Sequence, residues 1–191
     1  MDILVTGFKP FLGESINPSE KLANELGSVT NVRSMILTVE FGKSFEVLKT
    51  ELAKKKPDYL ILIGQAGGRK NVCFEKIGLN WVQTNHADEN GMTPVPGMIH
   101  AASPLALMSK FPIDEIYKKL KKQGLPVEIS FSAGAFVCND LYFRVLNEFT
   151  EIKTVFIHVP MLPEQLKTLD TRPALAYAEQ ALVLKSMIEL L

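Results

Sequence analysis

The sequence predicts an α/β protein with a mainly parallel sheet. Short apolar runs alternate with amphipathic segments along the chain. The runs are rich in Val, Ile and Leu and mostly lack polar alternation, as is typical of parallel strands buried on both faces. No internal repeat or low-complexity linker interrupts this order, and 191 residues fit one domain.

Five apolar runs are the expected strands, namely residues 3–5, 35–39, 59–63, 127–131 and 155–159. Five segments are the expected helices, namely those that start at residue 17 and those over 44–56, 113–122, 136–149 and 173–191. Asn17 is the expected N-cap of the first helix, with Pro18 in its first turn. Active sites of parallel sheets gather at the carboxyl ends of strands, so residues just after a strand are the first candidates.

Composition excludes several classes of protein. Hydrophobic residues make up 47% and charged residues 22%, which excludes disorder. The 21 basic and 21 acidic residues cancel, which argues against a nucleic-acid partner. No apolar run approaches the roughly 20 residues that span a bilayer, so no membrane partner is expected. Two cysteines without a CxxC motif favour a reducing compartment, and we expect a cytoplasmic protein.

Cys138 is the first candidate catalytic residue. It follows the expected strand 127–131 and a turn of small residues, and it falls in the first turn of the expected helix. There the helix dipole and unpaired N–H groups would lower the pKa of the thiol and hold a developing oxyanion. The alternative is a small buried apolar residue, which is the commoner role of cysteine.

His158 and Glu75 are the other two candidates. His158 stands at the end of an apolar strand and is either a general base or a core histidine, whereas His86 and His100 lie in expected loops. If residues 72–79 form one strand, Glu75 shares a face with Cys73, Ile77 and Leu79 and needs a partner there. That partner is either an imidazole or, in a strand-edge salt bridge, Lys76. Cys73 is then a core residue.

Together the three candidates supply a nucleophile, a general base and an orienting carboxylate. No zinc-binding motif competes with them, and neither a metal nor a cofactor is expected. A second hypothesis is a phosphate or nucleoside site at Arg69 and the Gly67-Gly68 turn, although the spacing of a P-loop is absent.

Four motifs in register resemble the pyroglutamyl-peptidase I (pyrrolidone-carboxylate peptidase) family of cysteine peptidases. They are TGFKPFLG at residues 6–13 with NPS at 17–19, GQAGGR at 64–69 followed by Glu75 and Asn80, SAGAFVCN at 132–139, and FIHVP at 156–160 with PEQ at 163–165. The resemblance covers most of the chain.

The resemblance implies a single three-layer α/β/α domain over residues 1–191, with a mainly parallel, mixed central sheet. It implies that Cys138 is the nucleophile, His158 the base and Glu75 the acidic member. Phe8 and Phe11 match aromatic residues that line the pyroglutamyl pocket, and Gln65 matches a glutamine near the lactam; Phe136 is a further candidate lining residue. The implied substrates are pyroglutamyl peptides, and a homodimer or homotetramer is expected.

Departures from the family pattern keep a rival open. The residue after Glu75 is usually Arg and here is Lys76, and Asn85 stands in a stretch where many members carry Arg. Lysine cannot reproduce the planar, bidentate ion pair of arginine. The rival hypothesis is therefore a catalytically impaired homologue that binds a peptide or a small ligand.

Overall fold

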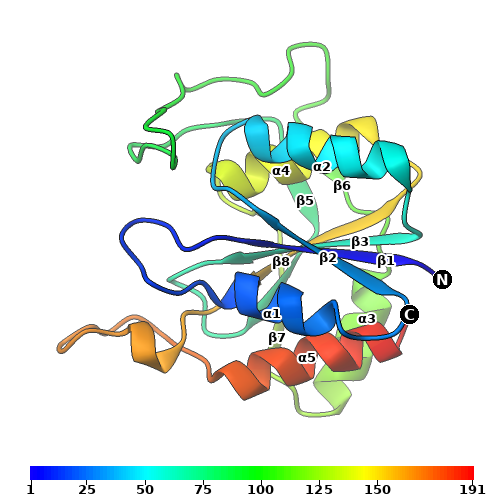
Figure 1. The fold of residues 1–191 in the computed structure, drawn as a ribbon, viewed down its shortest axis with the longest axis vertical. Coiled ribbons are helices and arrows are strands. Elements are labelled where there is room, and N and C mark those ends of the chain that lie inside the picture. The colour runs from blue at the N-terminus through cyan, green and yellow to red at the C-terminus, as the bar shows by residue number, and fades with distance from the viewer.

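The computed structural model describes residues 1–191, and a six-stranded sheet runs through its middle (Figure 1). The strands of this sheet are β1 (Ile3–Phe8), β2 (Val32–Leu37), β3 (Tyr59–Gln65), β4 (Val72–Glu75), β7 (Val127–Ser130) and β8 (Lys153–Val159). All five predicted runs overlap these strands. Only β2 is displaced, because it pairs with β1 from Val32 onward and Val39 packs in the core beyond its end.

The sheet is mixed and mostly parallel, as predicted. Its strand order is β2-β1-β3-β8-β4-β7, and the first four strands are mutually parallel. β4 is antiparallel to β8 and parallel to β7, so these last two strands run in the opposite direction. The carboxyl end of β7 therefore points opposite to the carboxyl ends of β3 and β8.

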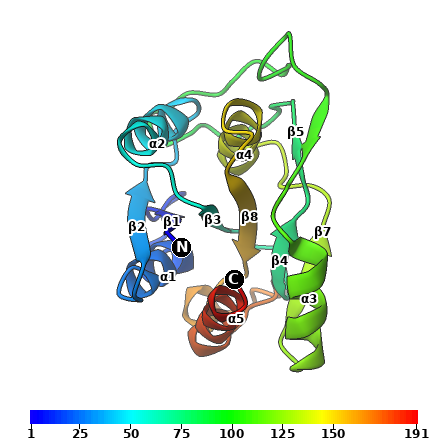
Figure 2. The same cartoon turned by 90° about the vertical axis from the view of Figure 1, so that its right-hand side faces the viewer.

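Helices cover both faces of the sheet, which confirms the three-layer prediction (Figures 1 and 2). The helices are α1 (Pro18–Leu26), α2 (Lys43–Lys54), α3 (Ile113–Lys122), α4 (Val137–Glu148) and α5 (Tyr177–Glu189), with a short 3-10 helix η1 (Pro163–Gln165). α2 and α4 lie on one face, and α1, α3 and α5 lie on the other. The predicted helix 173–191 begins later because Leu175 N–H donates to the Met161 carbonyl and keeps this stretch extended.

Alternate residues of the central strands enter the two cores. Leu60 and Leu62 of β3 pack under α2 and α4, whereas Ile61 and Ile63 pack on the opposite face. All four are fully buried, as expected of a strand between two helix layers. None of the helices is both long and apolar enough to cross a membrane.

The start of α1 is fixed to the end of β1. Asn17 caps the helix as predicted, since its Oδ1 accepts a hydrogen bond from Ser19 N at 3.0 Å. Ser19 Oγ in turn accepts a hydrogen bond from Phe8 N at 3.0 Å. Gly7 allows this approach, because a β-carbon there would lie 2.2 Å from the Ser19 carbonyl oxygen.

The prediction of one continuous strand over residues 72–79 is wrong. The chain leaves the main sheet after Glu75: Lys76 N–H still donates to the Ser130 carbonyl at the end of β7, but the Lys76 carbonyl accepts from Ser109 N–H, next to β6. β5 (Ile77–Leu79) then pairs with β6 (Ala106–Met108) in a separate two-stranded sheet beside α4 (Figure 2). Cys73 and Glu75 therefore share a face as predicted, but the residues of β5 belong to another sheet.

Candidate active site

Cys138 is the second residue of α4. Because β7 runs opposite to β8, the loop 131–136 carries the chain from the end of β7 to the start of this helix. Gly134 in the loop has a φ of 80°, a conformation that favours glycine. Asp140 N–H donates to the Phe136 carbonyl at the cap, so the N–H groups ahead of it are outside the helical ladder.

The surroundings of the Cys138 thiol favour its neutral form. Burial raises its pKa to about 12, and the negative charge of Glu75 acts in the same direction. The backbone N–H of Cys138 acts to lower this pKa, as expected at a helix N-terminus, but the loss of water around the sulfur outweighs it, so the net shift is opposite to the one predicted. The thiol needs a base to remove its proton when it reacts.

His158 and Glu75 form a buried pair. The His158 Nδ1 atom lies 2.8 Å from Glu75 Oε1, and both side chains are almost completely shielded from solvent. A carboxylate can only accept, so Nδ1 carries a proton, and in the neutral ring Nε2 keeps its lone pair. This tautomer is the one that a general base requires.

Gly64 places the sulfur and the imidazole on the same face of the sheet. It lies opposite His158 in the pairing of β3 with β8. A β-carbon at Gly64 would lie 3.1 Å from Cys138 Sγ and 2.9 Å from the ring of Phe156, which packs against the His158 ring. The thiol thus occupies the space that a side chain at position 64 would fill. No hydrogen bond joins the sulfur to the imidazole.

Arg69 is a third partner of this cluster. One guanidinium nitrogen, Nη2, lies 3.2 Å from Glu75 Oε1, 2.9 Å from Ser130 Oγ and 3.1 Å from the Ser132 carbonyl oxygen. Lys76, the partner weighed for Glu75 from the sequence, instead binds Asp114 at 2.7 Å. Arg69 is thus engaged with protein groups, which removes the observation behind a phosphate or nucleoside site.

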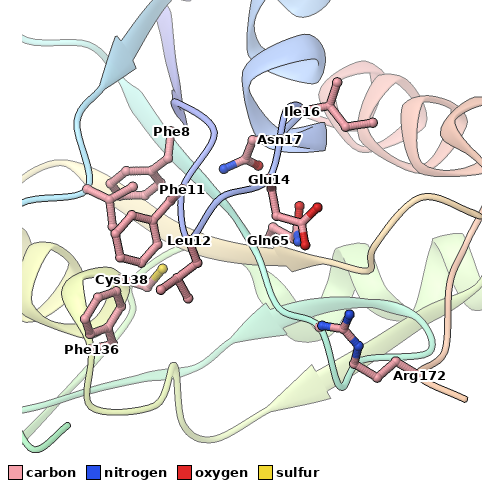
Figure 3. A pocket seen from close by; sticks show the side chains of 12 residues that line it. Phe8, Phe11, Leu12, Glu14, Ile16, Asn17, Gln65, Phe136, Cys138 and Arg172 are labelled. Carbon is pink, nitrogen blue, oxygen red and sulfur yellow. The ribbon is translucent and has the colours of Figure 1, made fainter. Parts of the chain in front are cut away.

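A cavity of about 350 Å³ opens beside Cys138 (Figure 3). Phe8, Phe11 and Phe136 stand on the side of the sulfur, and the rings of Phe11 and Phe136 stack with their centroids 5.6 Å apart. Gln65 lies at the polar side of the cavity. The other lining residues are Leu12, Glu14, Ile16, Asn17, Val39, Gly67 and Arg172.

The Gln65 side chain is held in one orientation. Its Oε1 accepts a hydrogen bond of 3.0 Å from Gln165 Nε2, which also donates to the Ile16 carbonyl at 3.2 Å. The Gln65 amide nitrogen therefore remains available as a donor. An aromatic wall with a fixed amide suits a flat, neutral ligand that carries its own polar atoms.

A model of the pyroglutamyl peptidase family matches residues 1–191, which is the whole chain. The chain belongs to this family. The match confirms the resemblance that the four sequence motifs indicated.

Relatives of known name support the same membership. A pyrrolidone-carboxylate peptidase of Bacillus cereus is 38% identical over 183 residues, which cover 91% of this chain and 85% of the relative. The solved pyroglutamyl peptidase I of Bacillus amyloliquefaciens has a TM-score of 0.90 at 34% identity, over 98% of this chain and 93% of the other. The pyrrolidone carboxyl peptidase of Fervidobacterium islandicum has a TM-score of 0.93 at 29% identity, over 99% and 97% of the two chains.

The departures from the pyroglutamyl peptidase pattern lie away from the buried pair. Lys76 points to α3 through its ion pair with Asp114, and Asn85 is exposed outside the cavity lining. His86 and His100 are exposed as predicted, and Cys73 is buried in the core as predicted. The cation that contacts Glu75 is instead Arg69, which lies in the turn after β3.

Sequence reasoning missed two sets of residues in this pyroglutamyl peptidase site. Arg69 was weighed only as a phosphate ligand, although its place shortly before Glu75 was a signal that the two could meet. Glu14 and Arg172 line the cavity without any motif of their own, and Leu12 lies in the motif at residues 6–13 but was not singled out. Arg172 comes from the segment after η1, which only the folded chain brings beside Gly67.

Proposed function

We propose that this protein is a cysteine exopeptidase that hydrolyses the bond after an N-terminal pyroglutamyl residue. One observation supports this most directly. Glu75 Oε1 and His158 Nδ1 lie 2.8 Å apart, on the same face of the sheet as the Cys138 sulfur. Cys138 in turn lines the aromatic cavity. Membership of the pyroglutamyl peptidase family supports the same reaction.

In the proposed acylation, His158 Nε2 takes the proton of the Cys138 thiol as the sulfur attacks the pyroglutamyl carbonyl carbon. Glu75 holds the ring in the required tautomer and stabilises the imidazolium that forms. The negative oxygen of the tetrahedral intermediate is stabilised by the free N–H groups at the start of α4. His158 then protonates the leaving amine, the C–N bond breaks, and a thioester to Cys138 remains.

Deacylation repeats these roles with water. His158 takes a proton from a water molecule, whose oxygen attacks the thioester carbonyl. The intermediate expels the Cys138 sulfur, which regains the proton from His158, and free pyroglutamate leaves. Because the same imidazole acts as base and then as acid, both half-reactions depend on its pairing with Glu75.

We propose that the cavity binds the pyroglutamyl ring. Pyroglutamate has no charged amine, so aromatic walls at Phe8, Phe11 and Phe136 favour its flat neutral ring. The free amide nitrogen of Gln65 is a donor for the ring carbonyl. Proline has no such carbonyl, so a prolyl group would leave this donor without a partner in the cavity.

A chromogenic pyroglutamyl amide tests the proposal. Wild type should cleave it, and Cys138→Ala should lose at least about 10⁴-fold in kcat, as nucleophile variants do. Cys73→Ala removes the other thiol, which is buried away from the cavity, and should keep its activity. The matching prolyl amide should be cleaved at least about 10³-fold more slowly. Turnover that survives in Cys138→Ala would dismiss the proposed nucleophile.

We further propose that residues 1–191 act as one domain in a cytoplasmic homodimer or homotetramer. Both cysteines are free, which suits a reducing compartment. Leu105 and Met108, beside and within β6, are large apolar side chains that are 74% and 64% exposed in the single chain. Light scattering at micromolar concentration tests the assembly, and a monomer would contradict it.

A further inference from the structure

Glu75 is a buried carboxylate with an uneven set of partners. Its Oε1 receives both the imidazole N–H of His158 and the guanidinium of Arg69, whereas its Oε2 has no hydrogen-bond partner. A buried carboxylate is unstable without an opposite charge. The identity of that charge determines how firmly Glu75 stays ionised.

Arg69 is the only permanently charged cation that contacts Glu75. The other titratable groups that face the carboxylate are Cys73 of the same strand, Cys138 and Tyr142 of α4, and His158 of β8. A thiol or a phenol carries no positive charge in either protonation state, and an imidazole carries one only when it is protonated. The Lys76 ammonium is held by Asp114 on the other side of the chain.

The same nitrogen of Arg69 also holds the segment that leads to the nucleophile. It donates to Ser130 Oγ at the end of β7 and to the Ser132 carbonyl in the loop before α4. The side chain is about one-third exposed, so it spans from solvent to the buried pair. The Arg69 guanidinium therefore connects Glu75, the acid of the proposed triad, with the loop that leads to Cys138.

We infer that Arg69 is a positioning residue for the reaction: its guanidinium, in contact with Glu75, Ser130 and Ser132, holds the carboxylate against His158 and fixes the approach to Cys138. This inference rests on the proposed function, because it concerns the same catalytic cluster. Arg69 is outside the cavity lining and is not assigned a contact with the substrate.

Removal of this charge has a predictable effect on the pH profile. Without the guanidinium, a proton binds more easily to the carboxylate and to the imidazole beside it, because less positive charge opposes it. Both changes protonate the general base or its partner at a higher pH than in wild type, so the base is no longer able to accept a proton there. The acid limb of the kcat/KM profile, which reports ionisations of the free enzyme, should therefore move upward.

The experiment compares wild type with Arg69→Gln and Arg69→Met on a pyroglutamyl amide across pH 5–9. Each variant should lose about 10- to 100-fold in kcat, which is the scale of one charge-assisted hydrogen bond, with KM changed less than about threefold. The acid limb should rise by about one pH unit. Arg69→Lys keeps the charge and should restore the acid limb to its wild-type position.

Arg33→Gln is the matched control. Arg33 is also partly exposed and forms ion pairs with Asp2 and Glu51 far from the cavity, so its loss should leave kcat and the acid limb unchanged. A folded Arg69→Gln or Arg69→Met variant with wild-type kcat and a wild-type acid limb would overturn the inference. If wild type itself cleaves no pyroglutamyl amide, the proposed function fails instead, and the inference falls with it.

Discussion

At the scale of single residues, the surroundings of the Cys138 sulfur are the main feature of the site. Gly64 has no β-carbon, so the Cys138 sulfur can lie against β3. The thiol has no hydrogen bond from His158 and no nearby cation to favour its ionised form. The cluster therefore resembles a serine-type arrangement, in which the base acts during attack, more than a preformed thiolate and imidazolium pair.

The first prediction concerns the reactivity of Cys138. Because burial raises the pKa of this thiol to about 12, the thiolate fraction should increase about tenfold per pH unit between pH 7 and 10. The rate of alkylation by iodoacetamide should follow the same slope. Mass spectrometry of a Cys73→Ser background measures it at a single thiol. A rate independent of pH over this range would show that the thiol is already ionised.

At the scale of secondary structure, the start of α4 is fixed by Asn139. This buried side chain accepts a hydrogen bond from Leu79 N at 2.9 Å and donates to the carbonyls of Leu79 and Trp81. These contacts connect the first turn of the helix to β5 and to the residues that follow it. The residue directly after the proposed nucleophile thus anchors its helix to the smaller sheet.

The second prediction is that Asn139→Ala lowers both stability and activity. It leaves one N–H and two carbonyl groups without their partner, which should cost about 2–4 kcal/mol in the free energy of unfolding. Urea titration followed by circular dichroism measures this loss. Asn139→Asp keeps the acceptor for Leu79 N but loses both donors and should not recover the stability of wild type. A change below about 0.5 kcal/mol for Asn139→Ala would contradict the anchoring role.

Much of the architecture could be predicted from the sequence because it depends on local patterns. The capped start of α1 at Asn17 and the apolar run in β3 are visible in a few adjacent residues. The break after Glu75 could not be predicted, because it depends on where β7 ends, far along the chain. The position of Arg69 and the raised pKa of Cys138 likewise depend on burial by segments remote in sequence.

At the scale of the whole molecule, one ion pair and one hydrogen bond connect two helices of an outer layer, α1 and α5. Glu25 of α1 contacts Tyr177 and Lys185 of α5, so the last helix is tied to the first. The hydrogen bond from Lys185, with a further contribution from Tyr177, lowers the pKa of Glu25 below its ordinary value of 4.5. These contacts join α1 to α5 on the face of the sheet that α3 also covers (Figure 2).

The third prediction concerns acid stability. A carboxyl group whose pKa is lowered by folding contributes stability above its unfolded pKa and loses it as the pH falls through the folded value. Wild type should therefore melt at a higher temperature than Glu25→Gln at pH 7, and the difference should shrink below pH 4.5. Calorimetry over this range measures the difference. Equal melting temperatures at pH 7 would contradict a stabilising role for Glu25.

The bare backbone of Gly64 has a consequence for other chains of this architecture. The sulfur of Cys138 and a methyl group at position 64 compete for the same space, since only 3.1 Å would separate them. A homologue that carries any larger amino acid at this point must move its cysteine or forgo it. The residue at position 64 therefore distinguishes active cysteine peptidases from homologues that have the same fold but no catalytic cysteine in this place.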